Sequence, residues 1–247
     1  MKIRKLIVLL IGALLVMVSV VSSEDVPFLL EKTVVLISYS EPGLTHALGT
    51  GFLVSADGLV LTADHVIADE TNGDTVYPKL FAQRYTGTGT AFESYELSVV
   101  KRLRTAGKGP DIAVLRITRV PRNPLPFLQI GQAPSAGAQI LVAGFPLVFD
   151  KVYPYPLFRQ GTIASTRYNY EDTPVIVLDL TGVSGYSGSP VVDCVTGAVV
   201  AVFKGKPTAH PETNFSVAFT LNRRDVTDYD KSPSNQPLHI EPALPNR

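Results

Sequence analysis

The 247-residue chain is poor in residues that build covalent or metal cross-links, since it holds one cysteine and four histidines. Cys194 has no partner for an internal disulfide, and so few Cys and His residues exclude a structural Cys/His zinc site. Net charge is also lacking, because 22 basic residues balance 22 acidic ones. Residues 1–23 contain three basic residues and no acid, so 19 basic and 22 acidic residues remain without them, a net of −3. This balance excludes a strong electrostatic attraction to nucleic acid or anionic lipid.

The first 23 residues have the three-part pattern of a secretory signal peptide. Residues 1–5 are basic, residues 6–21 form an uninterrupted apolar run, and polar residues follow from Ser22. We expect cleavage before Glu24, because this run of 16 residues is shorter than the roughly 20 that span a bilayer. The alternative is a membrane anchor, with residues 6–21 retained as a tether. In both cases the rest of the chain is expected to be extracytoplasmic, periplasmic or secreted, and stabilised by its core alone.

Helical periodicity is missing from the rest of the chain, where no apolar pattern of helical spacing extends over three turns. Short β-branched and apolar segments recur instead, separated by Gly, Pro, Asn and Asp. Asp57-Gly58 between two apolar runs predicts a hairpin, because glycine accepts a positive φ there. Strands are predicted at residues 33–39, 49–54, 59–62, 95–100, 111–117, 139–143, 158–164, 175–180, 198–203 and 215–221. The sequence therefore predicts an all-β sandwich or barrel.

Two proline-rich stretches suggest how the chain is divided. Residues 118–127 contain three prolines and are predicted to connect two half-domains. The apolar rhythm stops near residue 225, and residues 226–247 contain four prolines. We interpret 226–247 as a proline-rich, mobile C-terminal tail, too short for a second binding domain.

Three short stretches carry residues that can do chemistry together. Residues 61–66 place His65 directly after a predicted strand, residues 111–117 open with Asp111, and residues 182–190 form a glycine-rich turn around Ser187. Taken singly, each has an ordinary structural explanation as a strand end, a cap or a loop. Together they supply serine nucleophilic catalysis, which needs a hydroxyl, a base to take its proton and a carboxylate to orient that base.

The same stretches resemble a known family. GTGFLV…GLVLTADHV, DIAVLRI and GYSGSPVVD are similar to the motifs of trypsin/chymotrypsin-like serine peptidases. The nearest branches are the bacterial HtrA/Deg-type proteases and the glutamyl endopeptidases, and the resemblance covers residues 30–222. It implies two packed antiparallel Greek-key β-barrels with the active site in the cleft between them. The peptidase domain would span residues 27–225, with barrel 1 at about 30–118 and barrel 2 at about 127–222.

The resemblance also implies an activity and residue roles. An exported serine endopeptidase would hydrolyse protein or peptide substrates through an acyl-enzyme intermediate, with no cofactor and no metal. His65 would be the general base, Asp111 would orient it, and Ser187 would attack the substrate carbonyl. The backbone N–H groups of Gly185 and Ser187 would form the oxyanion hole, which stabilises the negative charge that develops on that carbonyl.

The family's spacing places Thr181 near the base of the S1 pocket and Gly205 on one of its walls. Thr181 carries no charge, which argues against a demand for Arg or Lys at P1. Val202 stands where the glutamyl enzymes have a His, so a small or medium apolar P1 residue is favoured, although nearby Lys204 leaves a preference for Glu open. Lys204 and Lys206 are interpreted as solvated loop charges, and Cys194 as a thiol in a hairpin turn.

The sequence departs from the family at three points. Tyr186 replaces the Asp or Asn usually found before the nucleophile, Ser189 replaces a glycine after it, and no PDZ domain is expected after residue 225. One alternative is therefore a protease-like binding protein that is catalytically impaired or gated by substrate, since a bulky Tyr186 can distort the oxyanion turn. An α/β-hydrolase with Ser187, Asp228 and His239 is disfavoured, because it needs Gly at position 189 and repeated helices.

Overall fold

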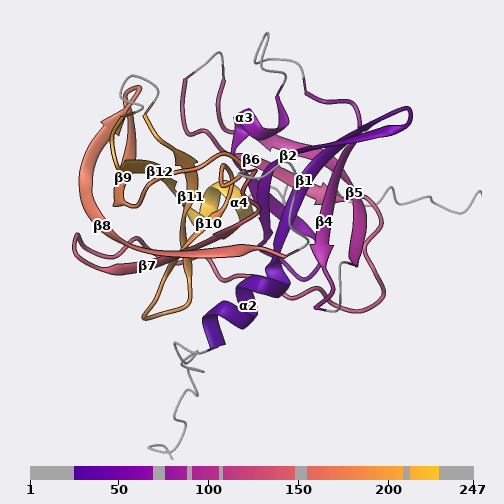
Figure 1. Ribbon diagram of the computed structural model, residues 1–247, viewed down its shortest axis with the longest axis horizontal. Helices are drawn as coiled ribbons and strands as arrows, with labels where there is room; N and C mark the ends of the chain where they lie inside the picture. The colour runs from indigo at the N-terminus through magenta and orange to yellow at the C-terminus, as the bar shows by residue number, and fades with distance from the viewer. Residues whose placement is uncertain are drawn as a thin grey trace, which may run out of the picture.

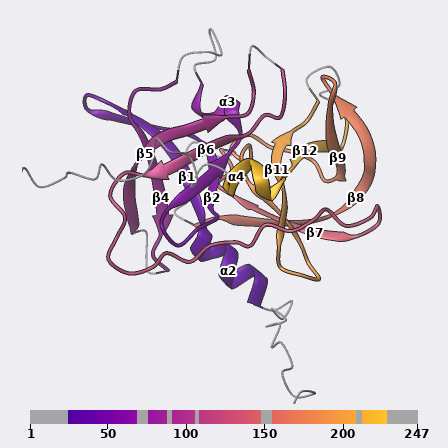
Figure 2. The same cartoon turned by 180° about the vertical axis from the view of Figure 1, so that it is seen from behind.

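A computed structural model describes residues 25–68, 76–87, 91–105, 108–147, 155–207 and 212–227. The predicted signal segment and the residues after 227 lie outside this part of the chain. Within it, the strands close into two antiparallel barrels that lie side by side, barrel 1 in indigo to magenta and barrel 2 in salmon to yellow (Figures 1 and 2). The predicted all-β fold of two packed barrels is confirmed. None of the described helices is long and apolar enough to cross a membrane.

Barrel 1 follows a nine-residue helix, α2 (Asp25–Thr33). Its strands are β1 (Val34–Glu41), β2 (Leu44–Leu53), β3 (Leu59–Thr62), β4 (Leu80–Tyr85), β5 (Phe92–Arg102) and β6 (Ala113–Ile117). A single helical turn, α3 (Asp64–Ile67), follows β3. The order around the barrel is β1-β2-β3-β6-β5-β4, so β3 lies next to β6 although two other strands of the same barrel, β4 and β5, come between them in the chain.

Barrel 2 has the corresponding circular order β10-β11-β12-β9-β8-β7. Its strands are β7 (Gln139–Gly144), β8 (Leu157–Tyr170), β9 (Thr173–Asp179), β10 (Pro190–Asp193), β11 (Val199–Gly205) and β12 (Phe215–Thr220), and a short helix, α4 (Arg223–Thr227), comes after β12. Each strand segment predicted from the sequence falls on one of the strands of the two barrels. Helix α2 and strands β4 and β10 were not predicted.

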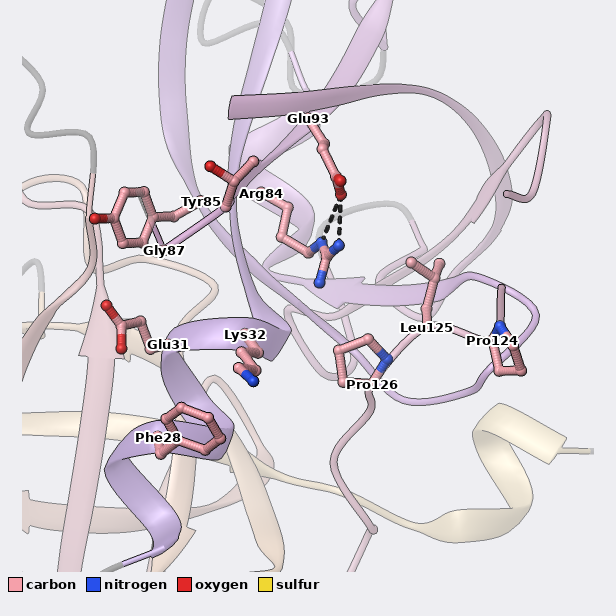
Figure 3. A pocket seen from close by; sticks show the side chains of 11 residues that line it. Phe28, Glu31, Lys32, Arg84, Tyr85, Gly87, Glu93, Pro124, Leu125 and Pro126 are labelled. Atoms are coloured by element: carbon pink, nitrogen blue, oxygen red, sulfur yellow. Dashed lines mark hydrogen bonds and ion pairs between the residues drawn. The ribbon is translucent and has the colours of Figure 1, made fainter. Parts of the chain in front are cut away.

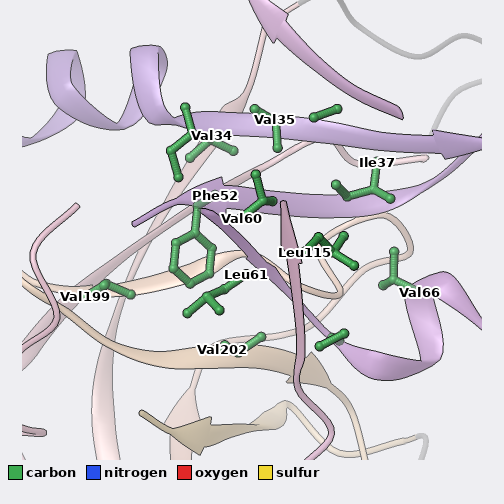
Figure 4. Close-up of a cluster of buried hydrophobic side chains, with 14 of the residues drawn as sticks. Val34, Val35, Ile37, Phe52, Val60, Leu61, Val66, Leu115, Val199 and Val202 are labelled. Carbon is green, nitrogen blue, oxygen red and sulfur yellow. The ribbon is translucent and has the colours of Figure 1, made fainter. Parts of the chain in front are cut away.

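A single cluster of buried apolar side chains joins the two barrels. Phe52 on β2 and Leu61 on β3 pack in the same cluster as Val199 and Val202 on β11 (Figure 4). The first five residues of β11 are buried on both faces, because the strand lies between the interior of barrel 2 and barrel 1. A second cluster, which includes Phe203, fills the interior of barrel 2. Most of β11 is therefore packed where the two barrels meet, with its last two residues half-buried.

Candidate active site

The register of β3 against β6 places His65 beside Asp111. Thr62 on β3 pairs with Ala113 on β6, and the strands are antiparallel. The residues just after β3 therefore lie against those just before β6. His65, in α3, has its Nδ1 atom 2.7 Å from Asp111 Oδ2, and its backbone N–H donates to Asp111 Oδ1 at 3.0 Å. Both carboxylate oxygens of Asp111 thus hold one histidine, through its ring and its main chain.

The carboxylate of Asp111 is buried, with 2% of its side chain exposed, whereas the His65 side chain is 38% exposed. Burial alone would raise the pKa of Asp111. The hydrogen bond from His65 and the positive charges of His65 and Lys204 outweigh burial and hold the pKa of Asp111 far below its ordinary value. An ionised Asp111 accepts a hydrogen bond from Nδ1–H, which leaves Nε2 as the ring nitrogen of His65 that can take a proton.

A second ion pair anchors α3, the turn that carries His65. The helix is four residues long and has no side-chain cap at its N-terminus, so it has little intrinsic stability. Asp64 is buried and meets Arg102 of β5 in a bidentate pair, with Nε–Oδ1 at 2.6 Å and Nη2–Oδ2 at 2.8 Å. Asp64 and Asp111 therefore fix the two sides of the same turn.

The loop between β9 and β10 presents Ser187 and depends on two glycines. Gly185 has φ +91° and Gly188 has φ +85°, values that side chains rarely adopt. A Cβ atom would collide with the carbonyl oxygen of Phe145 at Gly185 and with that of Thr50 at Gly188. The backbone N–H of Thr50 donates to Ser187 O at 2.9 Å. The loop belongs to barrel 2 but is docked on β2 of barrel 1.

The hydroxyl of Ser187 donates to the backbone carbonyl of Lys204 at 3.0 Å. No hydrogen bond joins it to His65 among the contacts of the described residues. In apo enzymes the bond between nucleophile and base is often long and tightens only when substrate binds. The structure thus brings the three predicted residues into one site, with His65 and Asp111 in contact and Ser187 held by β11.

The N–H groups predicted to form the oxyanion hole differ from their neighbours in hydrogen bonding. The N–H groups of Tyr186, Gly188 and Ser189 donate to backbone carbonyls, at 3.3, 2.8 and 2.9 Å. Those of Gly185 and Ser187 have no acceptor in the part of the chain that is described. Neither predicted donor is therefore engaged by a described backbone carbonyl.

Tyr186 turns away from the nucleophile into barrel 2. Its side chain is buried, its ring and that of Phe203 pack edge to face with centres 6.4 Å apart, and its hydroxyl donates to Leu157 O of β8 at 3.1 Å. Burial raises the pKa of Tyr186 to about 12, so the hydroxyl stays neutral and remains a donor. Tyr186 ties the loop to β8 where the animal enzymes that the sequence resembles have an acidic residue.

The two residues predicted for the S1 pocket lie close together. A Cβ on Gly182, the residue after Thr181, would be 3.3 Å from Gly205 Cα. Thr181 Oγ1 donates to Asn214 O at 3.5 Å, and the guanidinium of Arg159 donates to the carbonyl of Thr181. The segment at Thr181 and the end of β11 are thus neighbours, and Arg159 places a cation beside them.

One cavity lies beside these elements, and a second lies elsewhere, on barrel 1. One, of about 510 Å³ and mainly apolar, is lined by residues of β8, β9 and β12 and by Pro207, Glu212 and Thr213 near the end of β11. The other, of about 670 Å³, lies beside α2, and the Arg84–Glu93 ion pair is part of its lining (Figure 3). Helix α2 and α3 lie at opposite ends of barrel 1 in both ribbon views, so the second cavity is remote from His65.

Lys204 is the main residue of the site that the sequence did not reveal. Its Nζ atom is 2.9 Å from Asp111 Oδ2, and 13% of its side chain is exposed. The interpretation of Lys204 as a solvated loop charge is therefore wrong, because the packing of barrel 2 on barrel 1 covers it. Cys194 lies in the turn between β10 and β11, and burial raises the pKa of its thiol, which is typical of an unreactive cysteine. Among the described residues, no group of three His, Cys, Asp or Glu side chains is placed to bind a metal ion.

Comparison with known proteins adds independent evidence. Residues 49–202 match the family of trypsin-like peptidase domains. One relative, from Pseudomonas fluorescens, is named a probable periplasmic serine endoprotease, DegP-like, and is 29% identical over 160 residues. The matched segment covers 63% of this chain and 29% of that protein. The chain therefore spans about three tenths of the length of such relatives.

Solved structures show the same fold. The crystal structure of the serine endoprotease from Yersinia pestis superposes with a TM-score of 0.60 at 20% identity, covering 81% of this chain and 62% of that one. The HtrA-type protease AlgW with decapeptide gives a TM-score of 0.60 at 17% identity, covering 81% and 64%.

Proposed function

Because the chain belongs to the family of trypsin-like peptidase domains, we propose that it is a serine endopeptidase in which Ser187, His65 and Asp111 form the catalytic triad. The observation that carries this proposal is the double contact of buried Asp111 with His65, beside the loop that presents Ser187. A carboxylate that binds both the ring and the main chain of a histidine fixes its tautomer and orientation, which general base catalysis requires.

In the proposed reaction the Ser187 hydroxyl leaves the Lys204 carbonyl, turns to His65 Nε2 and gives up its proton as Oγ attacks the substrate carbonyl. The negative charge that develops on the substrate oxygen is received by the N–H groups of Gly185 and Ser187, which have no other described acceptor. His65 then protonates the leaving amine. Water, activated by the same histidine, hydrolyses the acyl-enzyme and restores Ser187.

We propose peptides as substrates, with an apolar P1 residue of small or medium size. One structural relative contains a decapeptide and another, also an AlgW protease, a tripeptide. Thr181 carries no charge, and the mainly apolar cavity of about 510 Å³ lies next to the predicted S1 wall. We further propose that the protein acts outside the cytoplasm, since residues 1–23 resemble an export signal and several relatives are named periplasmic.

A substrate-gated form of the same enzyme is the second candidate. The observation that favours it is the hydrogen bond from Ser187 to Lys204, which occupies the hydroxyl proton in the absence of substrate. In such an enzyme, peptide binding would be needed before Ser187 turns to His65.

Digestion of an unstructured protein, followed by mass spectrometry of the peptides, tests the proposal. We expect internal cleavages with wild type and none with Ser187→Ala or His65→Ala, both of which should remain folded. Wild-type cleavage by either variant would contradict the assignment. A lag that preincubation with a peptide product abolishes would favour the substrate-gated form.

A further inference from the structure

A single carboxylate oxygen of Asp111 contacts two nitrogen atoms, one from His65 and one from Lys204. Oδ2 lies 2.7 Å from His65 Nδ1 and 2.9 Å from Lys204 Nζ. The carboxylate is 2% exposed and the lysine side chain 13% exposed, so water screens neither group well. The ammonium group also lies 5.4 Å from the centre of the Tyr170 ring. Lys204 is thus held over an aromatic face, with its charge directed at Asp111.

This arrangement changes what Asp111 does for His65. In the proposed mechanism, the carboxylate stabilises the imidazolium that forms when His65 takes a proton. Lys204 compensates part of the same negative charge. The two nitrogens bound to Oδ2 lie within about 6 Å of each other, a range at which like charges oppose each other inside a protein. A positive His65 is therefore less favoured with Lys204 present than without it.

Other charged groups near His65 do not duplicate this effect. On α3, Asp64 is neutralised by the bidentate pair with Arg102 of β5. On the β8–β9 side, Tyr170 offers Lys204 its ring, and the next residue, Glu171, is paired with Arg104. Among the described residues, Lys204 is the cation that contacts the same carboxylate oxygen, Asp111 Oδ2, as His65.

We propose that Lys204 is a positioning residue that sets the acid limit of activity: its ammonium group holds Asp111 in place and opposes protonation of His65, which keeps the base available at lower pH. This inference rests on the proposed function. It assigns the Lys204 side chain a role distinct from that of its backbone carbonyl, which accepts the Ser187 hydroxyl. A side-chain substitution leaves that carbonyl in place and so isolates the effect of the charge.

The test measures two rates between pH 4 and pH 9. One is kcat/KM for a peptide substrate, and the other is the rate at which a fluorophosphonate labels Ser187, which does not depend on peptide binding. Lys204→Met keeps most of the side-chain length without the charge, and Lys204→Arg keeps the charge. Lys101→Met is the matched control, because Lys101 is an exposed lysine on β5.

In Lys204→Met, we expect a shift in the acid limb, the acidic side of the pH profile on which the rate falls. The pH at which the rate reaches half of its maximum there should rise by about one unit, both for kcat/KM and for fluorophosphonate labelling. Lys204→Arg and Lys101→Met should keep the wild-type limb. If Lys204→Met fails to fold, Lys204→Gln removes the charge while keeping a hydrogen-bond donor, and should show the same rise.

An unchanged acid limb in the uncharged variants would overturn the inference. So would an equal loss of rate at every pH, because that result indicates a purely structural role. These outcomes are distinct from failure of the proposed function, in which wild type itself is neither labelled at Ser187 nor active on peptides.

Discussion

The buried ion pair under His65 gives a sharp stability prediction. Asp64 is 3% exposed and Arg102 is 21% exposed, and two hydrogen bonds join them. Removing one partner of a buried pair costs about 3–5 kcal/mol, because the other charge is left uncompensated. Since Arg102 retains some contact with water, we expect Arg102→Met to lower the free energy of unfolding by about 3 kcal/mol, the lower end of that range.

A double-mutant cycle separates the ion pair from general effects of the substitutions. Asp64→Asn removes the buried charge, so the double variant Asp64→Asn/Arg102→Met should lose less stability than Arg102→Met alone. Arg84→Met is the control, because the Arg84–Glu93 pair (Figure 3) has a carboxylate that is 45% exposed and should contribute less than about 1 kcal/mol.

Urea unfolding at pH 7, followed by circular dichroism, provides the free energies. The reasoning fails if Arg102→Met is no more destabilising than Arg84→Met. It also fails if the double variant loses the sum of the two single effects, because independent losses would mean that Asp64 and Arg102 do not act as a pair.

Three further predictions follow from the same site. Asp111→Asn should lower kcat by about 10⁴ while the fold persists, because an amide no longer enforces the productive tautomer of His65. Steady-state kinetics measure the loss of kcat, and circular dichroism checks the fold. A loss of kcat below tenfold would count against the triad. Ser189→Ala should leave stability unchanged or raise it by about 1 kcal/mol, because the buried Ser189 hydroxyl has no partner among the described residues; a clear loss in urea unfolding would show that the hydroxyl is bonded. Because burial raises the pKa of Tyr186 to about 12, its contribution to stability is complete below about pH 10 and declines as the pH rises towards 12. The stability difference between wild type and Tyr186→Phe should therefore shrink over that range, and a constant difference would be inconsistent with a buried neutral phenol.

The strands were predictable because their signals are local. The alternating apolar segments and the Asp57-Gly58 turn report on neighbouring residues, and Gly58 has the positive φ of +88° that the hairpin requires. Helix α2 escaped prediction because its nine residues fall short of three turns, although Val26 and Leu30 are buried. Strand β4 (Leu80–Tyr85) alternates between buried and half-buried over its first four residues, but its sequence begins with three apolar residues, so its apolar pattern does not show this alternation.

The candidate site residues that stand in family motifs could be predicted from the sequence. The contacts between residues far apart in the chain could not. His65, Asp111 and Ser187 stand in recognisable motifs, so resemblance was enough to nominate them. The contact of Lys204 with Asp111 joins residues 93 positions apart, and the Asp64–Arg102 pair joins residues 38 apart. Both depend on how strands assemble in the barrels, and no local pattern distinguishes these lysine and arginine side chains from solvated ones.

The central claim is that Ser187 is an activated nucleophile, and intact-mass measurement after treatment with a fluorophosphonate tests it most directly. The account predicts a single adduct on wild type and none on Ser187→Ala. No adduct on well-folded wild-type protein, or an equal adduct on Ser187→Ala, would contradict it.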